Sequence, residues 1–296
     1  MTNIARPAQQ AADAFHDVKD QAEQQARNAV RKAGPWLERL ARLGLVAKGV
    51  VYLTIGLLSL QAAFGARGDT ADREGALRTV GRQPFGKVML AVIAAGLIGY
   101  ALWRFIQAFL NPELEDDDAK GWSRRAVRLI SGLIYGALAL AALQLLTGVG
   151  RFRSGGDSTA DWTRSLMSWP LGRWLVILAG LAVAGVGVWQ FYKAFKADLA
   201  KKLELGKMGQ AGRDWVVRFG RVGIAARGFV FLVMAGFLVV AGARANPREA
   251  KGVGGALEAL ERAPYGPWLL AAVAAGLIAY GLYQFGEARY RRMPQA

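Results

Sequence analysis

Long apolar stretches alternate with polar segments along this chain, and the alternation occurs six times. Each stretch reaches the roughly 20 residues that a helix needs to cross the hydrocarbon core of a bilayer. Their interiors contain no Asp, Glu or His. Because backbone polar groups in lipid must hydrogen-bond within their own segment, the pattern predicts helices rather than strands. The six predicted membrane helices cover residues 43–66, 88–110, 126–149, 174–195, 222–243 and 268–286.

The first, third and fifth stretches repeat one motif. In each, a basic residue precedes an aromatic residue by ten positions, and a glycine precedes that aromatic by three. Glycines in membrane helices are typical of places where two helices approach closely, so we expect these three at equivalent helix contacts. The residue before each glycine is basic in two copies and Ser in the middle one. The motif residues are Arg42, Lys48, Gly49 and Tyr52; then Arg125, Ser131, Gly132 and Tyr135; then Arg221, Arg227, Gly228 and Phe231.

The second, fourth and sixth stretches also repeat, and they open at Pro84, Pro170 and Pro264. Proline suits the first turn of a helix, where its missing N–H leaves no hydrogen bond unmade. The polar segment before each proline has apolar residues at helical spacing, which predicts a short amphipathic helix at the membrane surface. The glycine-rich residues 154–159 lack the lysine of a phosphate-binding loop, so they are predicted to form a flexible connector.

Together these patterns predict an all-α membrane protein built from three two-helix repeats. Each repeat crosses the membrane twice, so all three point the same way and are related by an axis along the membrane normal. The predicted architecture is a six-helix bundle with pseudo-threefold symmetry. We divide the chain into a polar N-terminal tail (1–37), repeat 1 (38–113), repeat 2 (114–200) and repeat 3 with a short basic C-terminus (201–296).

The charge distribution predicts an orientation. The net charge is +16, which in a soluble protein would point to nucleic acid, but here the basic residues cluster between apolar stretches. The side of the membrane that carries both termini holds 25 Lys and Arg residues, against 13 on the side of the three connectors. The positive-inside rule then places both termini in the cytoplasm, and the expected partner is a bilayer with anionic headgroups rather than nucleic acid.

The polar tail leaves two interpretations open. Alanines and a few larger apolar residues recur at helical spacing between Ala11 and Ala33, which predicts a helix with a weak apolar face. Such a helix is either solvated or lies on the membrane or against a protein partner at the cytoplasmic face. The tail has no apolar core followed by a small-residue cleavage site, so a secretory signal is not expected.

The repeated "RLGLVAKGVVY", "GALRTVGRQPFG" and "YALWRFIQAF" segments resemble a bacterial membrane family built from three copies of the DUF1206 domain, a two-helix domain of unknown function. The resemblance covers nearly residues 38–290. The middle copy departs most, since Ser131 replaces the basic residue and Trp162 and Thr163 replace the Ala-Leu of the connector. The resemblance implies a six-helix protein of the bacterial cytoplasmic membrane and supplies no catalytic residues.

The side chains inside the predicted helices argue against an enzyme. Intramembrane proteases need a nucleophile with a base, paired Asp residues or a metal site, and no such set is present in the predicted spans. We therefore expect no catalytic residue, no metal site and no cofactor. Two function classes remain. The absence of buried acids and the apolar helices favour a non-enzymatic structural or interaction protein of the membrane; the alternative is a small channel or transporter for anions or lipid phosphate with a path along the pseudo-threefold axis. The oligomeric state stays open.

Lys48 can be placed in two ways. In the first, its stem lies in lipid and its ammonium group reaches the headgroups, where with Arg227 it contacts phosphate or the last turn of a neighbouring helix. In the second, Lys48, Ser131 and Arg227 face the pseudo-threefold axis and form a vestibule suited to anions. The sequence favours the first placement. The candidate headgroup or anion contacts are Arg42, Lys48, Arg125, Ser131, Arg221 and Arg227, and the candidate packing residues are Gly49, Gly132, Gly228, Pro84, Pro170 and Pro264.

Overall fold

The computed structural model describes residues 39, 42–65, 73–82, 86–109, 119–148, 155–196, 199 and 209–290. The N-terminal tail (1–37) and Pro84 lie outside these residues. Within the described part the regular structure is helical, and six helices are long and apolar enough to cross a membrane. They are the first membrane helix (Arg42–Ala63), α3 (Gly86–Phe109), α4 (Ala119–Thr147), α6 (Gly172–Lys196), α7 (Gln210–Ala243) and α9 (Gly266–Tyr290).

A short helix precedes the second membrane helix of each repeat, as the connector pattern predicts. These are α2 (Arg73–Gly81), α5 (Gly155–Met167) and α8 (Val253–Glu261); the 3-10 turn η3 (Pro247–Glu249) comes just before α8. On α2 and α8 the apolar face is buried against the bundle, through Leu77 and Leu257 among others. The prediction of a flexible glycine-rich connector at 154–159 is wrong, because α5 begins at Gly155 and runs through this segment. The glycines at the start of this segment are part of a helix rather than a loop because the helix continues through Ala160 to Met167.

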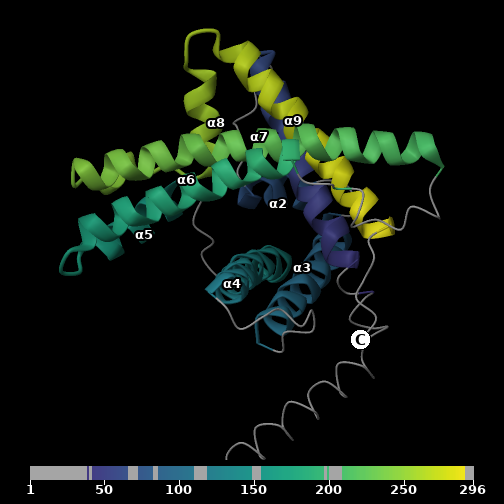
Figure 1. Ribbon diagram of the computed structural model, residues 1–296, viewed down its shortest axis with the longest axis horizontal. Helices are drawn as coiled ribbons and strands as arrows, with labels where there is room; N and C mark the ends of the chain where they lie inside the picture. Colours follow the sequence, from purple (N-terminus) through teal and green to yellow (C-terminus); the bar gives the residue numbers. More distant parts are fainter. Residues whose placement is uncertain are drawn as a thin grey trace, which may run out of the picture.

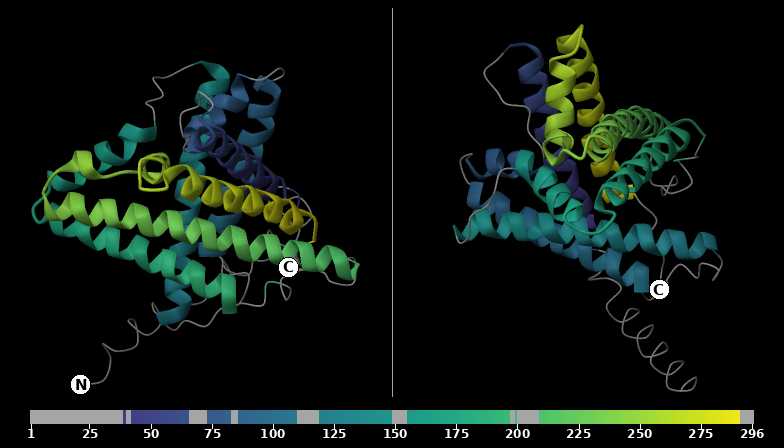
Figure 2. Two further views of the ribbon diagram at one scale, coloured as in Figure 1. Left: turned by 90° about the horizontal axis from the view of Figure 1, so that it is seen from above. Right: turned by 90° about the vertical axis from the view of Figure 1, so that its left-hand side faces the viewer.

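The membrane helices associate as three antiparallel pairs, each joining the second helix of one repeat to the first helix of the next. The pairs are α3 with α4, α6 with α7, and α9 with the first membrane helix. The pairs cross one another steeply: in Figure 1, α6 and α7 run side by side across the view, whereas α4 is seen nearly along its axis. Figure 2 shows the same α6–α7 pair from two further directions.

One glycine closes each pair, and all three glycines are those of the repeated motif. Gly49 lies against Phe285 of α9, Gly132 against Phe105 of α3, and Gly228 against Phe191 of α6. Each of these phenylalanines stands 21 residues after the proline of its repeat. A side chain at any of the glycines would meet the opposite ring or backbone, so the bare glycine lets the two helices approach. The structure therefore places Gly49, Gly132 and Gly228 at equivalent helix contacts.

Within a repeat, the two membrane helices pack closely in only two of the three copies. In repeat 1 Gly44 lies against Tyr100, and in repeat 3 Gly223 lies against Tyr280 at the equivalent position. In repeat 2 the corresponding residues are Val127 on α4 and Val186 on α6, and among the described residues these two helices form no comparable interface. The pseudo-threefold arrangement is thus approximate, with one open seam in the middle repeat.

The structure corrects the predicted place of the prolines. Pro170 and Pro264 are exposed and lie two residues before α6 and α9, rather than in the first helical turn or at a helix contact. Each occupies the second position of a β-turn that the N–H of Gly172 or Gly266 closes by donating to a carbonyl three residues back, at 2.9 and 2.8 Å.

The residue after each of these prolines has a left-handed backbone, with φ of 64° at Leu171 and 59° at Tyr265. A positive φ at the third position of a turn, directly after a proline at the second position, is the geometry of a type II turn. The following Gly172 or Gly266 packs directly on the last carbonyl groups of the connector helix, where a side chain would collide. The repeated Pro-x-Gly motif is therefore the corner between connector helix and membrane helix.

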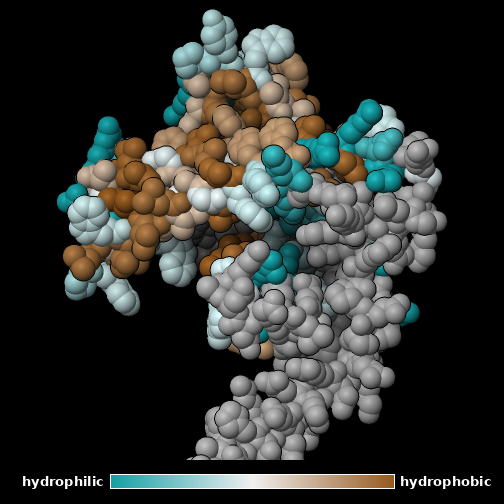
Figure 3. Space-filling view, viewed as in Figure 1, coloured by the Kyte–Doolittle hydropathy of each residue, from teal (hydrophilic) through white to brown (hydrophobic). Residues whose placement is uncertain are grey.

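Apolar side chains cover most of the visible surface over α6, α7 and α9 (Figure 3). Large exposed residues on α4 and α6 include Leu133, Leu140, Leu178 and Trp189. A soluble monomer rarely exposes so much contiguous apolar surface, whereas lipid-facing helices require it. The distribution agrees with a multi-pass membrane protein.

Candidate functional site

Six charged side chains, one from each membrane helix, face a common cavity of about 240 Å³. Five are basic and one is acidic, so the lining carries a clear excess of positive charge. The cavity lies where the first helix of each repeat begins and the second helix ends, which is the end of the bundle away from the connector helices. The six residues are Lys48, Arg104, Arg128, Lys193, Arg227 and Glu287; we call this set the charged layer.

The repeat places several of these side chains in equivalent positions. Gln107, Lys193 and Glu287 each stand 23 residues after the proline of their repeat, and all three line the cavity. Arg104 and Gln190 stand 20 residues after it, together with Gln284, which is almost fully buried. Lys48 and Arg227 occupy one position of the first-helix motif. The cavity is thus built from repeated positions whose residue types have diverged.

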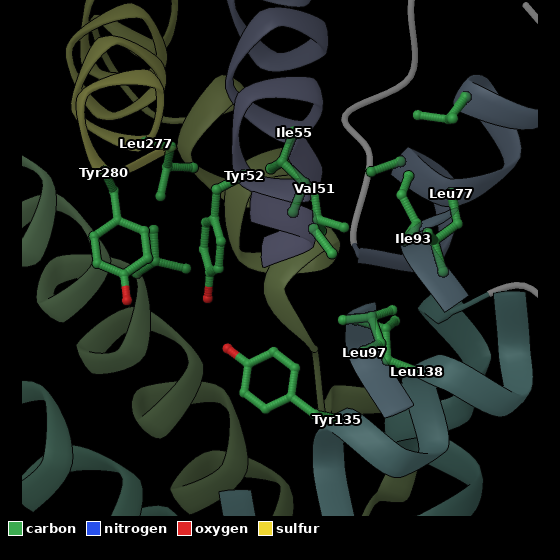
Figure 4. Packing of buried hydrophobic residues seen from close by; sticks show 14 of the residues in the cluster. Val51, Tyr52, Ile55, Leu77, Ile93, Leu97, Tyr135, Leu138, Leu277 and Tyr280 are labelled. Carbon is green, nitrogen blue, oxygen red and sulfur yellow. The ribbon is translucent and has the colours of Figure 1, made fainter. Parts of the chain in front are cut away.

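A tyrosine layer lies next to the charged layer and holds two of its cations. The Nζ of Lys48 lies 5.7 Å from the ring centroids of Tyr100 and Tyr135 and 5.2 Å from that of Tyr280. The guanidinium of Arg227 lies 5.3 Å from the Tyr280 centroid. Cation–π contacts of this kind each contribute about 0.5–2 kcal/mol, more when desolvated. They stabilise a buried cation without neutralising its charge. The layer comprises Tyr52, Tyr100, Tyr135 and Tyr280, and in Figure 4 the hydroxyl group of Tyr135 points toward that of Tyr52.

An aliphatic layer follows the tyrosines and closes the bundle in the direction of the connectors. It is formed by Ile55, Leu97, Leu138 and Leu277, all buried (Figure 4). On each of their helices the order is the same: a charged residue, then a tyrosine, then an aliphatic residue. On these four helices the buried aliphatic residues therefore lie between the polar cavity and the connector end of the bundle.

Hydrogen bonds hold the charged layer in place while leaving donors directed to the cavity. Arg104 donates from Nη2 to the hydroxyl of Tyr100 at 2.6 Å and from Nη1 to Oε1 of Gln107 at 3.0 Å. Arg227 donates from Nη1 to the hydroxyl of Tyr280 at 2.9 Å. The Nε of Arg227 and the Nε2 of Gln190 are buried donors with no acceptor among the described residues. Buried donors without acceptors are costly, so this arrangement suits a ligand that accepts hydrogen bonds.

Lys48 and Glu287 are linked through Gln284. In the carboxamide orientation that satisfies both neighbours, Lys48 Nζ donates to the amide oxygen at 3.1 Å and the amide nitrogen donates to Glu287 Oε2 at 2.8 Å. Lys48 is only 7% exposed and Glu287 8%. The acid is the one acidic side chain of the cavity lining, and it is placed to offset part of the surrounding positive charge.

The candidate residues from the sequence divide between this cavity and the protein surface. Lys48 and Arg227 lie inside, in the second of the two placements that we described, whereas Ser131 donates to the carbonyl of Val127 at 2.8 Å and does not line the cavity. Contact with a helix end is made instead by Arg42, whose Nη1 donates to the carbonyls of Ala288 and Arg289 at 2.8 and 2.7 Å. Cations are favoured there by the helix dipole.

Arg125 and Arg221 lie on the outer part of the bundle. Arg125 is half-buried with its guanidinium 5.3 Å from the Trp122 ring centroid, and Arg221 is exposed. Arg125 lies in the second turn of α4 and Arg221 about three turns into α7, and their contact with lipid headgroups stays a prediction.

Sequence reasoning missed most of the cavity. Glu287 was outside the predicted span, which ended at residue 286, whereas α9 continues to Tyr290. The missed signal was available: positions 20 and 23 after each proline are polar in all three repeats, inside otherwise apolar helices. Positions three residues apart share one helix face, so this pattern predicts a polar stripe on each second helix.

The chemistry of the lining favours an anion. Five cations repel a metal ion, and within the described residues no group of three or more His, Cys, Asp or Glu side chains lies together. Arg and Lys donors in a desolvated cavity bind carboxylate or phosphate oxygens through charge-assisted hydrogen bonds. At about 30 Å³ per water in the liquid, the cavity is large enough for a phosphate group and several waters.

Comparison with known proteins identifies the family. The model of the Domain of Unknown Function (DUF1206) matches three segments, residues 43–111, 128–197 and 222–291. The uncharacterized protein YxxB of Bacillus subtilis (strain 168) is 34% identical over 259 residues, covering 88% of this chain and 93% of that protein. No solved structure matches the chain. The chain belongs to the DUF1206 family, with three copies of the domain that coincide with the three repeats.

Proposed function

We propose that this DUF1206 family member is a non-enzymatic protein of the cytoplasmic membrane that binds a phosphate-class anion in its cationic cavity. The observation that carries the proposal is the charged layer: among the described residues, five basic side chains from five different membrane helices converge on one space with one carboxylate. Desolvating several like charges together is unfavourable unless an opposite charge joins them. An anionic ligand supplies that charge and accepts hydrogen bonds from donors such as Arg227 Nε and Gln190 Nε2.

Binding is favoured over conduction. A channel along the pseudo-threefold axis would need a polar path past Ile55, Leu97 and Leu277, which are buried members of one apolar cluster. An enzyme would need a nucleophile or an acid–base pair beside the ligand, whereas the lining supplies mainly donors and cations that polarise or hold. We therefore assign the cavity to recognition of an anion, in keeping with an interaction protein of the membrane.

The test is phosphate binding by the purified protein in a neutral detergent. Inorganic phosphate and pyrophosphate are titrated while heat and melting temperature are recorded, and the melting temperature should rise with anion concentration. Arg104→Gln and Arg227→Gln should each weaken binding by about 10- to 100-fold, since a charge-assisted hydrogen bond contributes about 1.5–3 kcal/mol. Arg164→Gln is the matched control, because Arg164 pairs with Asp161 on the exposed side of α5. A folded parent that binds neither anion contradicts the proposal, and so does equal weakening by the control.

The proposed orientation places both termini, and with them the cavity end of the bundle, in the cytoplasm. The native chain has no Cys, so single cysteines can be introduced and probed with a membrane-impermeant thiol reagent on intact cells. A cysteine at Glu249, in the connector before α8, should be labelled, and a cysteine at Thr2 should react only after the membrane is opened. The reverse pattern would overturn the orientation.

A further inference from the structure

The open seam between α4 and α6 has a specific cause in the sequence. In repeats 1 and 3 the bare glycines Gly44 and Gly223 allow the two helices of the repeat to meet at a tyrosine. In repeat 2 the equivalent pair is Val127 and Val186, which are 59% and 43% exposed. Both are apolar, so the walls of the seam at this level suit hydrocarbon rather than water.

The seam leads to the cavity. On α4, Arg128 follows Val127 directly and lines the cavity. On α6, Gln190 and Lys193 also line it, about one and two helical turns beyond Val186. The two helices that do not pack together thus each carry apolar residues at the seam and a cation at its inner end. Figure 1 shows α4 and α6 as well-separated helices.

The apolar seam suits the acyl chains of a phospholipid, and the cationic cavity at its inner end suits the phosphate of the headgroup. In a chain that spans a membrane, the unpaired faces of α4 and α6 are in contact with acyl chains. A headgroup that follows those chains inward meets Arg128 and Lys193 first and then the buried cations Lys48 and Arg227. The described lining residues comprise five cations and one carboxylate, so an acidic headgroup is favoured over one that carries its own ammonium group.

We infer that the anion bound in the cavity is the phosphate of an acidic phospholipid, which enters laterally through the α4–α6 seam and leaves its acyl chains along the exposed faces of these two helices. The inference rests on the proposed function, since it names the source of the phosphate. It also assigns the seam as a lipid-binding surface, with Val127 and Val186 in contact with the chains and Arg128, Gln190 and Lys193 in contact with the headgroup.

The experiment compares four probes on delipidated protein in neutral detergent: phosphatidylglycerol, phosphatidylcholine, glycerol 3-phosphate and inorganic phosphate. Native mass spectrometry counts bound lipid, and the melting temperature reports stabilisation. Phosphatidylglycerol should bind with a defined stoichiometry and more tightly than phosphatidylcholine. It should bind on the order of 100-fold more tightly than glycerol 3-phosphate, because each acyl methylene buried on the protein adds to the affinity.

Substitutions that fill the seam test lipid binding separately from anion binding in the cavity. Val127→Trp and Val186→Trp fill the seam without changing the charged layer, so they should weaken phosphatidylglycerol binding on the order of tenfold through lost acyl contact. Inorganic phosphate should bind as it does to the parent. Val222→Trp is the control, because Val222 is 56% exposed at a similar level of α7 and lies outside the seam.

The outcomes are distinguishable. Phosphate binding with no preference for phosphatidylglycerol, or seam variants that bind the lipid like the parent, would refute the lipid and leave the anion site standing. Equal binding of phosphatidylcholine would refute the acidic headgroup. Failure of the parent to bind any of the four probes would refute both the lipid and the proposed function.

Discussion

Replacing Glu287 by Gln will destabilise the protein by about 2–4 kcal/mol, the range expected when one member of a buried charge cluster is removed. Within the part of the chain that the structure describes, Glu287 is the one acidic side chain of the cavity lining; it is 8% exposed and accepts a 2.8 Å hydrogen bond from Gln284. Gln keeps the size and most of the hydrogen-bonding capacity of Glu. The loss therefore reports chiefly the negative charge that offsets the surrounding cations.

Added phosphate should restore the lost stability in this variant. An anion in the cavity replaces the missing negative charge, and a ligand present at 100 times its Kd adds about 2.7 kcal/mol to the free energy of unfolding. Anion binding should itself be tighter in Glu287→Gln than in the parent, because a repelling carboxylate is gone. The measurement is the melting temperature in neutral detergent with phosphate and with chloride at equal ionic strength.

Glu249→Gln serves as the control for this prediction. Glu249 pairs with Arg244 at 3.2 Å on the surface, where ion pairs contribute about 0–1 kcal/mol. The control should change the melting temperature little, with or without phosphate. A parent-like stability of Glu287→Gln would show that this carboxylate does not hold the cations of the lining together. A loss that phosphate does not relieve would show that an added anion does not take the place of the carboxylate.

The sequence predicts the fold well because the dominant physical constraints are visible in it. Apolar length decides which segments can span a bilayer, and glycine spacing decides where helices can approach, so the six helices and the positions of Gly49, Gly132 and Gly228 follow from pattern alone. The corner prolines were misplaced by two residues. The reason is that a type II turn at Pro170 or Pro264 and a helical first turn use the same residue, with φ near −65°.

The cavity was only partly predictable. Lys48 and Arg227 attracted notice as charges in apolar helices, but their depth could not be decided from helical position. Whether these two side chains point into the bundle or toward the headgroups depends on which neighbouring helices supply tyrosines. Tyr100 and Tyr280, which contact Lys48, lie far from it in the sequence. The open seam was harder still. Nothing in the length or hydropathy of α4 and α6 distinguishes them from the helices of the other repeats.

The divergence of the middle repeat nevertheless has one coherent physical reading. Its first helix lacks the cation of the repeated motif, since Ser131 stands where the other copies have Lys48 and Arg227, although Arg128 of the same helix is buried and lines the cavity. It also lacks the glycine that brings the two helices together. The missing motif cation and the missing helix contact therefore occur in the same repeat. Repeat 2 still contributes Arg128, Lys193 and Tyr135 to the charged and tyrosine layers, and in the proposed lipid-binding mode it also supplies the entrance.

The second large effect is expected from substitutions at the first-helix position that is Gly in repeats 1 and 3 and Val127 in repeat 2. They test whether the two helices of the middle repeat are less closely packed than those of the other repeats. Gly223→Val gives repeat 3 the residue of repeat 2, and the added side chain would fall on the backbone of Tyr280, which cannot move aside as a flexible side chain could. We expect the free energy of unfolding to fall by about 1–3 kcal/mol or more from overpacking, and anion binding to weaken because Tyr280 contacts both Lys48 and Arg227.

Val127→Leu is the control, because it enlarges the equivalent residue of repeat 2 by one methylene. It should change the free energy of unfolding by no more than about 0.5 kcal/mol, as exposed substitutions do. Melting temperatures of the two variants beside the parent decide the matter. Comparable destabilisation by both would mean that α4 and α6 are packed together like the other pairs and that the seam is closed.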